Sequence, residues 1–418
     1  MRHLSKHHRT AAILAAAVLG LAGLSACSSS QAGDTNAHVT LRYASWDKSP
    51  SPMQDQIIAA FEKANPNVTV EEEMTPHADY FTKLQTSLSG GSGPDVFWMN
   101  GPNFQLYASN GQLAPLTFDT SNYPKGLVDL YTYDGKQYGA PKDFDTIGVW
   151  YNKKLFDAAG LAYPKAGWTW DDYLSDAKAL TNKAKGVWGS AAALNNQQNY
   201  YNTIPQAGGY VINKAGTKSG YGSPEALKGI DFWVDQIKDG VSPTQQQMTD
   251  TAPEDMFTSG KVAMYWSGSW SAGTFNSNDA IKNDIDVAPL PKGHDGSQSV
   301  IHGLANVANA KSAHLDLAKK FAEFASGKQA ALITAKVGAV IPAYNGTQQL
   351  WVDSMPNYHL STFIDELKTA VPYPVSKNTA AWNSSEDSIL SQVWALSVTP
   401  EAGLKELARQ MQAALDKE

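Results

Sequence analysis

The chain has 418 residues, enough for two lobes of ordinary domain size, and its formal net charge is −7. Three of its 33 basic residues, Arg2, Lys6 and Arg9, lie at the very start of the chain, so the rest of the chain is more acidic still. No basic cluster remains, which argues against nucleic acid as a partner. The chain holds 12 Trp and 18 Tyr, whereas only 17% of its residues are charged. This composition suits flat, uncharged ligands that carry many hydroxyl groups.

An apolar run over residues 11–24 follows the basic start. The run is shorter than the roughly 20 residues that a membrane-spanning helix needs, and it predicts a secretory signal peptide over residues 1–26. Its end resembles the bacterial lipobox, in which a cysteine is lipidated and becomes the first residue. Cys27, the only cysteine of the chain, holds that position, and residues 27–37 form a polar tether. An incidental buried thiol is the alternative to lipidation.

Apolar spacing predicts that strands and helices alternate along the first part of the mature chain. In chain order, we expect a strand over residues 39–44, a helix around 57–61, a strand over 68–70, a helix over 81–88 and a strand over 94–99. An Asp-Gly pair between alternating aromatic residues then predicts a β-hairpin over 131–138, and a strand covers 147–151. Alternation of this kind implies βαβ units, a mostly parallel sheet and hence an α/β fold.

Capping signals mark the next helices. Thr169, with Asp172 three residues later, is a variant of the capping box and predicts a helix start. Ser223 followed by Pro224 predicts the start of a second helix, which ends at Gly240. The remaining elements are expected as strands over 285–290 and 301–307, a helix over 315–324, a returning segment over 337–342 and a terminal helix opened by 399–401.

Residues 255–270 form the stretch around which the rest of the chain is arranged. Gly260 occupies a position where helices end in a left-handed residue, and residues 262–266 are an unbroken apolar run that predicts a strand buried on both faces. The run ends in a Ser-Gly turn between Trp266 and Trp270. Ligands of open α/β sheets bind at such an edge, so we predict that both tryptophans offer flat apolar surface to a ligand. The alternative is that both belong to the core.

Motifs of several enzyme classes are missing from the sequence. It contains no phosphate-binding loop, no HExxH motif and no paired CxxC motif, so it predicts neither a nucleotide site nor a metal site, and we expect no cofactor. The segment most similar to a nucleophile elbow surrounds Ser271, but it has Ser269 in place of the first glycine.

Asp143 and Asp145 are the carboxylate pair with the most suggestive position. Two residues apart on an extended segment, they are expected to point the same way, within the range that glycosidase acid–base pairs use. The same geometry suits two acceptors that grip neighbouring sugar hydroxyls. We favour sugar binding over catalysis, because nothing nearby indicates the raised pKa that a catalytic acid needs. A solvated pair on a loop is the third possibility.

Seven short motifs follow one another along the chain. They are Gly-Pro-Asp-Val-Phe at 93–97, Tyr-Gly-Ala-Pro at 138–141, Tyr-Asn-Lys at 151–153, Thr-Trp at 169–170, Phe-Thr-Ser-Gly-Lys-Val-Ala-Met at 257–264, Pro-Leu-Pro at 289–291 and Thr-Pro-Glu at 399–401. In this order and spacing they resemble the extracellular solute-binding proteins of carbohydrate ABC importers, of the maltose-binding-protein type. The resemblance covers nearly all of the mature chain. It implies a periplasmic-binding-protein-like fold of two α/β lobes joined by a hinge, with the ligand in the cleft between the lobes.

The resemblance also implies that each lobe is discontinuous. The N-terminal lobe is expected to comprise residues 38–145 and 302–345, and the C-terminal lobe residues 146–301 and 346–418. The chain then crosses between the lobes near Asp145, Ile301 and Asn345, so that a few backbone torsions carry the closure.

Ligand-binding residues follow from the resemblance position by position. The loop after the first strand supplies Trp46, Asp47 and Lys48, and the loop after the third strand supplies Met99, Asn100 and Asn103. Asp143 and Asp145 match the acidic position before the Tyr-Asn-Lys strand, Trp270 matches an aromatic platform, and Trp382 matches a second platform.

Two departures from the family pattern bear on the ligand. Met99, Pro102 and Asn103 stand where maltose-binding proteins have Trp, Asp and Arg, which argues against maltose itself. His302 and Gly303 stand where many relatives have two glycines.

We therefore expect a monomeric receptor that is tethered through Cys27 to the outside of the bacterial cell membrane. It is expected to bind a sugar or oligosaccharide and to deliver it to the permease subunits of an ABC importer. The alternative is a lipid-anchored glycoside hydrolase that uses Asp143 and Asp145. A third interpretation is a partner of a sensor that takes no part in transport.

Overall fold

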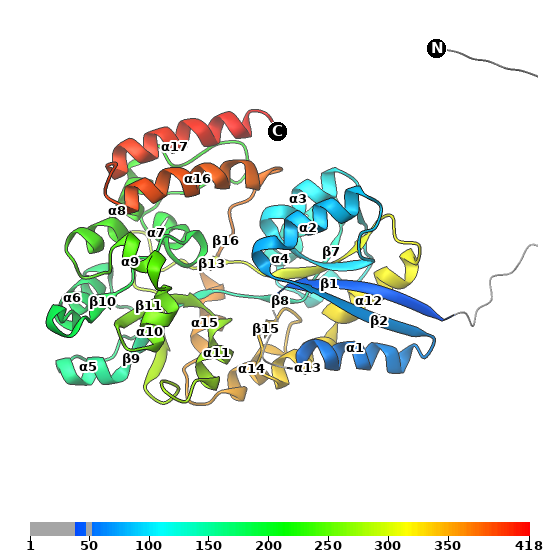
Figure 1. The fold of residues 1–418 in the computed structure, drawn as a ribbon, viewed down its shortest axis with the longest axis horizontal. Coiled ribbons are helices and arrows are strands. Elements are labelled where there is room, and N and C mark those ends of the chain that lie inside the picture. Colours follow the sequence, from blue (N-terminus) through cyan, green and yellow to red (C-terminus); the bar gives the residue numbers. More distant parts are fainter. Residues whose placement is uncertain (1–37, 47–51) are drawn as a thin grey trace, which may run out of the picture. The chain divides into compact units, whose positions relative to one another are not determined.

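The computed structural model describes residues 38–46 and 52–418 (Figure 1). The expected signal peptide, the tether and Cys27 lie outside the described residues. Asp47 and Lys48, two of the residues expected at the ligand, also lie outside them.

The first large sheet has six strands, in the order β2-β1-β3-β14-β4, with β7 also paired to β14. These strands are β1 (Val39–Trp46), β2 (Val68–Thr75), β3 (Val96–Asn100), β4 (Leu113–Ala114), β7 (Gly139–Pro141) and β14 (Leu304–Asn309). The helices of this part of the chain are α1 (Met53–Ala64), α2 (His77–Ser89), α3 (Gly101–Ser109), α4 (Lys125–Leu130), α12 (Leu315–Ser326) and α13 (Lys328–Lys336). β1 runs parallel to β2 and β3, whereas β14 is antiparallel to all of its neighbours.

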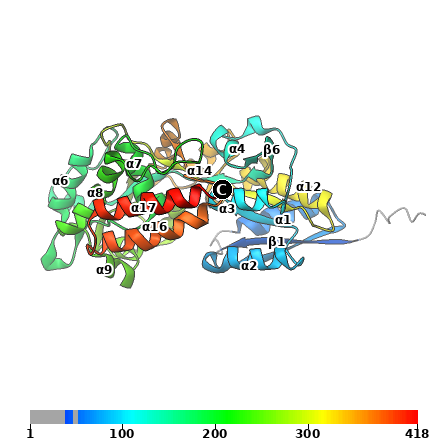
Figure 2. The same cartoon turned by 90° about the horizontal axis from the view of Figure 1, so that it is seen from above.

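The second large sheet has four strands, in the order β10-β11-β9-β12. They are β9 (Ile147–Asn152), β10 (Trp188–Ser190), β11 (Val262–Gly268) and β12 (Ile285–Ala288). The helices that accompany them are α5 (Lys153–Ala159), α6 (Trp170–Leu180), α7 (Tyr201–Gln206), α8 (Pro224–Lys238), α9 (Gln245–Asp250), α10 (Pro253–Thr258), α11 (Ser271–Ser277), α14 (Gln348–Ser354), α15 (Ser361–Asp365), α16 (Thr379–Trp394) and α17 (Pro400–Leu415). The last two helices run side by side and contact each other along their length (Figures 1 and 2).

The fold is α/β, as expected, but the expectation of a mostly parallel sheet is wrong. β9 is antiparallel to both β11 and β12, and β14 returns antiparallel between β3 and its other neighbours. The physical reason is that the chain enters β9 and β14 directly from the segments that link the two sheets. No βαβ crossover sets the direction of these strands.

Short two-stranded pairs mark where the chain passes from one sheet to the other. β8 (Asp143–Phe144) pairs with β15 (Ile341–Pro342), and β13 (Val300–Ile301) pairs with β16 (Val371–Pro372). Asp145 and His302 form an isolated bridge beside them. The remaining short elements are β5 (Thr132–Tyr133), β6 (Lys136–Gln137), the 3₁₀ turns η1 (Thr120–Asn122), η2 (Lys183–Lys185) and η4 (Glu366–Lys368), and the π-helix η3 (Asn196–Tyr200).

Residues 301–307, expected as one strand, are divided between β13 and β14. The break falls at His302 and Gly303. A Cβ at Gly303 would lie 2.3 Å from the carbonyl oxygen of Asp143, so only glycine permits this approach of two crossing segments.

Each large sheet has its own apolar core. Phe97 and Phe321 belong to the first core, and Trp150 and Trp266 to the second. Ile341 and Ala343 also pack in the second core, although they fall within the range expected for the N-terminal lobe. The limit between the two lobes near residue 345 therefore stays a prediction.

Several local expectations are confirmed. Thr169 and Asp172 form the capping box at the start of α6, and Thr399 caps α17. Gly260 has a φ of 70°, which is the left-handed conformation expected after α10. Asp134 and Gly135 have φ values of 47° and 70°, as a two-residue hairpin turn of this hand requires.

Candidate functional site

A cavity of about 680 Å³ lies where the crossing segments meet the ends of strands from both sheets. Its lining combines aromatic rings, carboxamides and charged groups. The lining residues are Trp46, Met53, His77, Trp98, Asn100, Pro102, Lys142, Asp143, Phe144, Asp145, Asn195, Asn196, Gln197, Gln198, Ser269, Trp270, His302, Leu304, Ala339, Val340 and Tyr373.

Two tryptophans from neighbouring strands form one aromatic wall. Trp46 ends β1, and its ring centroid lies 5.1 Å from that of Trp98 in an edge-to-face arrangement. The Trp98 indole N–H donates to the hydroxyl of Tyr43, which in turn donates to Asn306. Edge-to-face packing and the hydrogen bond fix the orientation of both indoles. This wall is therefore preorganised for a flat ligand face.

Lys142 and Asp143 form a buried ion pair on the cavity wall. The side chain of each is only 7% exposed, and the Lys142 ammonium contacts the Asp143 carboxylate. The other carboxylate oxygen accepts a hydrogen bond of 2.9 Å from the backbone N–H of Leu304. The Lys142 Nζ also lies 4.1 Å from the ring centroid of Trp98, a cation–π contact. Leu304 and Trp98 thus each hold one member of the pair in place.

Asp145 has a different environment from Asp143. Its Oδ1 accepts a hydrogen bond from the side-chain amide of Gln197, and its Oδ2 lies 4.0 Å from Nδ1 of His302. Burial, and next the negative charge of Asp143, raise the pKa of Asp145 well above its usual range. The expectation that nothing here raises the pKa of an acid is therefore wrong. Sequence spacing carried no information on how deeply the carboxyl group is buried.

His302 is a buried, neutral histidine. Burial, and next the electrostatic interaction with His77, lower its pKa to about 4. Its Nε2 accepts a hydrogen bond of 3.3 Å from the backbone N–H of Gly101, and its ring centroid lies 4.7 Å from that of Tyr373. The imidazole thus contacts the start of α3 and the segment after β16 at once.

A run of four carboxamides, residues 195–198, lines the cavity beside Asp145. Asn195 caps η3 by accepting from the backbone N–H of Gln198 at 2.9 Å. The Gln198 side chain donates to Ser267 Oγ at 2.9 Å, and Gln197 holds Asp145. π-Helical turns recur at functional sites because they aim side chains out of regular register. This segment was not predicted to belong to the site; the signal that could have indicated it is the uninterrupted Asn-Asn-Gln-Gln of residues 195–198.

Ser269 adds an unused hydroxyl to the cavity. The residue is 1% exposed, and within the described ranges its Oγ has no hydrogen-bond partner. A buried hydroxyl without a partner is unfavourable, so a ligand or water oxygen at this point stabilises it.

The structure brings five of the expected site residues together at the cavity. These are Trp46, Asn100, Asp143, Asp145 and Trp270. Lys142, His302 and Tyr373 join them without having been assigned to the site, because their position depends on how crossing segments pack and not on local spacing.

Contrary to expectation, four of the expected site residues do not line the cavity. Trp266 is 1% exposed and packs edge-to-face on Trp233, since β11 is covered on both faces. Met99 and Trp382 are 0% exposed, and the Trp382 indole N–H is bonded to Ser376. Asn103 donates to the side chain of Asn100 at 2.9 Å, so it positions Asn100 without itself lining the cavity.

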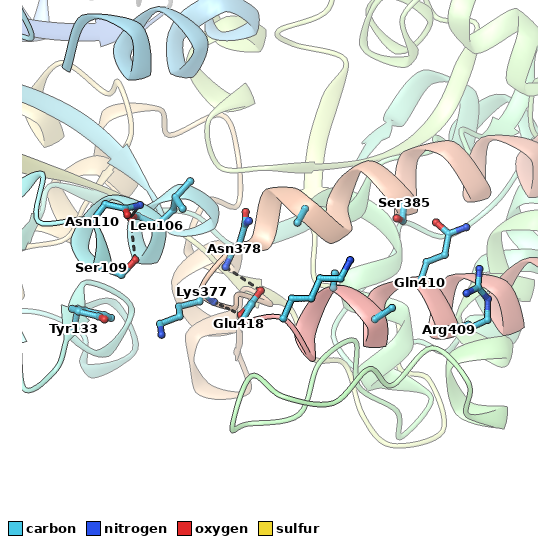
Figure 3. A pocket seen from close by; sticks show the side chains of 14 residues that line it. Leu106, Ser109, Asn110, Tyr133, Lys377, Asn378, Ser385, Arg409, Gln410 and Glu418 are labelled. Atoms are coloured by element: carbon cyan, nitrogen blue, oxygen red, sulfur yellow. Dashed lines mark hydrogen bonds between the residues drawn. The ribbon is translucent and has the colours of Figure 1, made fainter. Parts of the chain in front are cut away.

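A second hollow, of about 660 Å³, lies between the end of α3 and the helices α16 and α17 (Figure 3). The carboxylate of Glu418 accepts there from the backbone N–H groups of Lys377 and Asn378. Among the described residues, three cationic side chains and one aromatic ring line the hollow; these are Lys377, Arg409, Lys417 and Tyr133. Among its described lining residues, the hollow has no counterpart of the Trp46–Trp98 wall, so the first cavity remains the candidate site.

No group of three metal-binding side chains lies together within residues 38–46 and 52–418. No helix in the same ranges combines the length and apolar character needed to cross a membrane.

A cavity lined from both sheets beside the crossing segments, with aromatic walls and many hydrogen-bonding groups, defines a two-lobed binding protein. The profile of the bacterial extracellular solute-binding proteins matches residues 43–332, and the chain belongs to that family. Such proteins act outside the cytoplasm. The family consists of binding proteins and not of enzymes, and the glycoside hydrolase alternative finds no support.

Individual relatives extend the match over most of the chain. The maltodextrin-binding protein MdxE of Bacillus subtilis is 27% identical over 90% of this chain and 91% of its own. The diacetylchitobiose-binding protein DasA of Streptomyces coelicolor is 28% identical over 70% of each chain. The solved ABC substrate-binding protein of Listeria monocytogenes in complex with cycloalternan is 30% identical, with a TM-score of 0.84 over 91% of this chain and 99% of its own.

Proposed function

We propose that this protein is the carbohydrate-binding component of an ABC importer and that the cavity takes an oligosaccharide. One observation carries the proposal: the cavity pairs aromatic walls with a dense set of hydrogen-bonding groups. A pyranose ring has an apolar face and an edge of hydroxyls, and this lining complements both. Relatives whose names specify maltodextrin, diacetylchitobiose or a bound cycloalternan support a carbohydrate over other solutes.

Within this proposal, Trp270 stacks on a sugar ring and Trp46 contacts a neighbouring unit. Asn100, Asp145 and the carboxamides of η3 take the hydroxyls at the ring edges. Asp143 supplies its remaining lone pairs while it neutralises Lys142. Asp47 directly follows Trp46 in sequence and stays a proposed contact.

The lobes are proposed to comprise residues 38–145 with 302–345 and residues 146–301 with 346–418. Hinge closure on the sugar then follows from torsions near Asp145 and His302, where the chain crosses. Small-angle scattering of the protein with and without saturating sugar tests closure. An unchanged radius of gyration at saturation would count against a hinge.

A binding screen tests the function itself. The probes are maltotriose, galactotriose, diacetylchitobiose and cycloalternan, and the readout is the thermal unfolding temperature. A sugar present at 100 times its Kd adds about 2.7 kcal/mol to the free energy of unfolding, which gives a clear upward shift. Chromatography of the same mixtures should recover intact sugar. Hydrolysis products, or no shift with any of the four, would contradict a receptor for these sugars.

We further propose that Cys27 carries a lipid anchor and that the protein acts as a monomer beside its permease. A multiply acylated cysteine holds firmly, because each buried CH₂ contributes about 0.8 kcal/mol. Cys27→Ser should release the protein into the medium, where sedimentation should give the monomer mass. A variant that stays with membranes after a salt wash would contradict the anchor.

A further inference from the structure

His302 and Asp145 are held opposite each other at the crossing segments. The Asp145 N–H donates to the His302 carbonyl at 2.8 Å, and the His302 N–H donates to the Asp145 carbonyl at 3.2 Å. Gly303 allows this close approach, since a Cβ there would meet the backbone of Asp143. The two side chains therefore have fixed starting points on the cavity wall.

The hydrogen bond at Nε2 decides which ring nitrogen of His302 carries the proton. A backbone N–H can only donate, so Nε2, which receives the N–H of Gly101 at 3.3 Å, is unprotonated. Burial lowers the pKa of His302 to about 4, so the ring is neutral at pH 7. The single ring proton is consequently on Nδ1.

Nδ1 faces an acceptor that is too distant for a direct hydrogen bond. The separation between Nδ1 and Oδ2 of Asp145 is 4.0 Å, which is too long for a hydrogen bond. In the part of the chain that the structure describes, neither atom makes another hydrogen bond, because Gln197 occupies only Oδ1. Both side chains line the cavity and keep 9% and 16% of their surface exposed.

The width of this gap matches one oxygen atom. An oxygen placed about 2.8–3.0 Å from both atoms completes two hydrogen bonds, one received and one donated. The Tyr373 ring, 4.7 Å from the imidazole, and the bond from Gly101 hold the imidazole in place. The gap thus has a fixed width, with the Nδ1–H donor on one side and, on the other, Oδ2, which accepts when the Asp145 carboxyl group is ionised.

We infer that His302 and Asp145 form a specificity pair that holds a single hydroxyl group of the bound sugar between Nδ1 and Oδ2. The hydroxyl oxygen accepts from Nδ1–H, and the hydroxyl proton is donated to Oδ2. An ether oxygen cannot donate to Oδ2, and a deoxy carbon can make neither hydrogen bond, so neither can replace the hydroxyl group in this gap. The inference rests on the proposed function and adds to it a chemical rule for the sugar.

Calorimetric titration of two His302 variants tests the pair, with maltotriose, galactotriose, diacetylchitobiose and cycloalternan as probes. His302→Phe keeps a ring and loses the donor, so Kd should rise about tenfold or more for each sugar that binds the wild type. His302→Asn keeps an amide donor near the position of Nδ1 and should stay within about threefold. His294→Phe, an exposed histidine away from the cavity, is the matched control and should match the wild type. Wild-type affinity in His302→Phe would overturn the inference.

Nitrogen NMR of the histidine side chains in the sugar-free protein provides an independent readout. We expect the His302 signals of a neutral ring protonated on Nδ1, and a downfield change of the Nδ1 proton when a bound hydroxyl replaces solvent. A ring protonated on Nε2 would overturn the inference and leave the proposed function intact. Failure of all four sugars to bind the wild type would instead contradict the proposed function.

Discussion

The indole ring of Trp270 folds back over Gly268, so closely that a Cβ on Gly268 would lie 1.9 Å from Cζ3 of Trp270. Gly268 is the last residue of β11, and Trp270 precedes α11. The missing side chain at the strand end is therefore what lets the ring approach Gly268 and line the cavity. The position of the Trp270 ring thus depends on a glycine at position 268.

Gly268→Ala should displace the Trp270 ring and weaken sugar binding. The added methyl group cannot share space with the ring, so the ring must turn away from the position in which it lines the cavity. Aromatic contacts contribute about 0.5–1.5 kcal/mol beyond burial, so Kd should rise several-fold to about tenfold in calorimetric titration with the sugars of the screen.

Gly126→Ala in α4 is the matched control for this substitution. The nearest atom to a Cβ there is 4.0 Å away, so the variant should bind like the wild type. Equal affinity of Gly268→Ala and Gly126→Ala would mean that the ring position does not matter for binding.

Trp270→Ala should mainly weaken sugar binding, whereas Trp266→Ala should mainly lower the free energy of unfolding. Trp270 lines the cavity, and its removal should weaken binding by about 2–3 kcal/mol, tens- to about a hundredfold in Kd. Trp266 is buried against Trp233, and its removal should cost about 3–5 kcal/mol of unfolding free energy instead. Titration and a denaturant melt on both variants check this. A large stability loss with unaltered affinity for Trp270→Ala would make Trp270 a core residue.

These two tryptophans also show how far the sequence could be interpreted. The strand that carries Trp266, the turn after it and the nearby helix start were all predictable, because they depend on local apolar runs and on capping residues. Which of the two rings reaches the ligand was not predictable. It depends on α8 covering one face of β11, a contact between residues far apart in the chain.

The polar side of the site was less predictable for the same kind of reason. Asp143 and Asp145 were found because they are close in sequence. Their different environments depend on Lys142, Gln197 and His302, and two of these come from distant segments. The directions of β9 and β14 could not be predicted either, because a hydrophobic pattern indicates where a strand lies but not which strands it pairs with.

Glu386 predicts a pH dependence of stability. The residue is 1% exposed, and its carboxyl group contacts the hydroxyls of Tyr201 and Tyr221. Burial raises its pKa from 4.5 to about 8. Between these two pH values the unfolded chain is ionised and the folded chain is protonated, so the free energy of unfolding falls as pH rises, by at most about 1.4 kcal/mol per pH unit.

Glu386→Gln removes this titration and should be checked by denaturant unfolding between pH 4 and 9. The gain over the wild type should grow from about pH 4.5 and level off near pH 8. Glu401→Gln, at the exposed start of α17, is the control and should follow the wild-type curve. A constant difference between Glu386→Gln and the wild type across this range would show that the folded carboxyl ionises normally.

The Lys142–Asp143 pair predicts strong coupling between its two members. Both side chains are 7% exposed, so removal of one charge leaves the other buried without its partner. Asp143→Asn keeps an acceptor for the Leu304 N–H but strands the ammonium, and Lys142→Met strands the carboxylate beside Asp145. Each single variant should lose about 3–5 kcal/mol of unfolding free energy.

The double variant, Lys142→Met with Asp143→Asn, should lose far less than the sum, because no uncompensated charge remains. Denaturant melts of the wild type, both single variants and the double variant give the coupling energy directly. The exposed pair Lys125 and Asp129, with side chains 85% and 60% exposed, is the matched control. Its cycle should give less than about 1 kcal/mol, since solvent screens such a pair. If the losses of unfolding free energy in the two single variants add up in the double variant, the prediction is contradicted. Lys142 and Asp143 would then each be solvated by water instead of depending on each other.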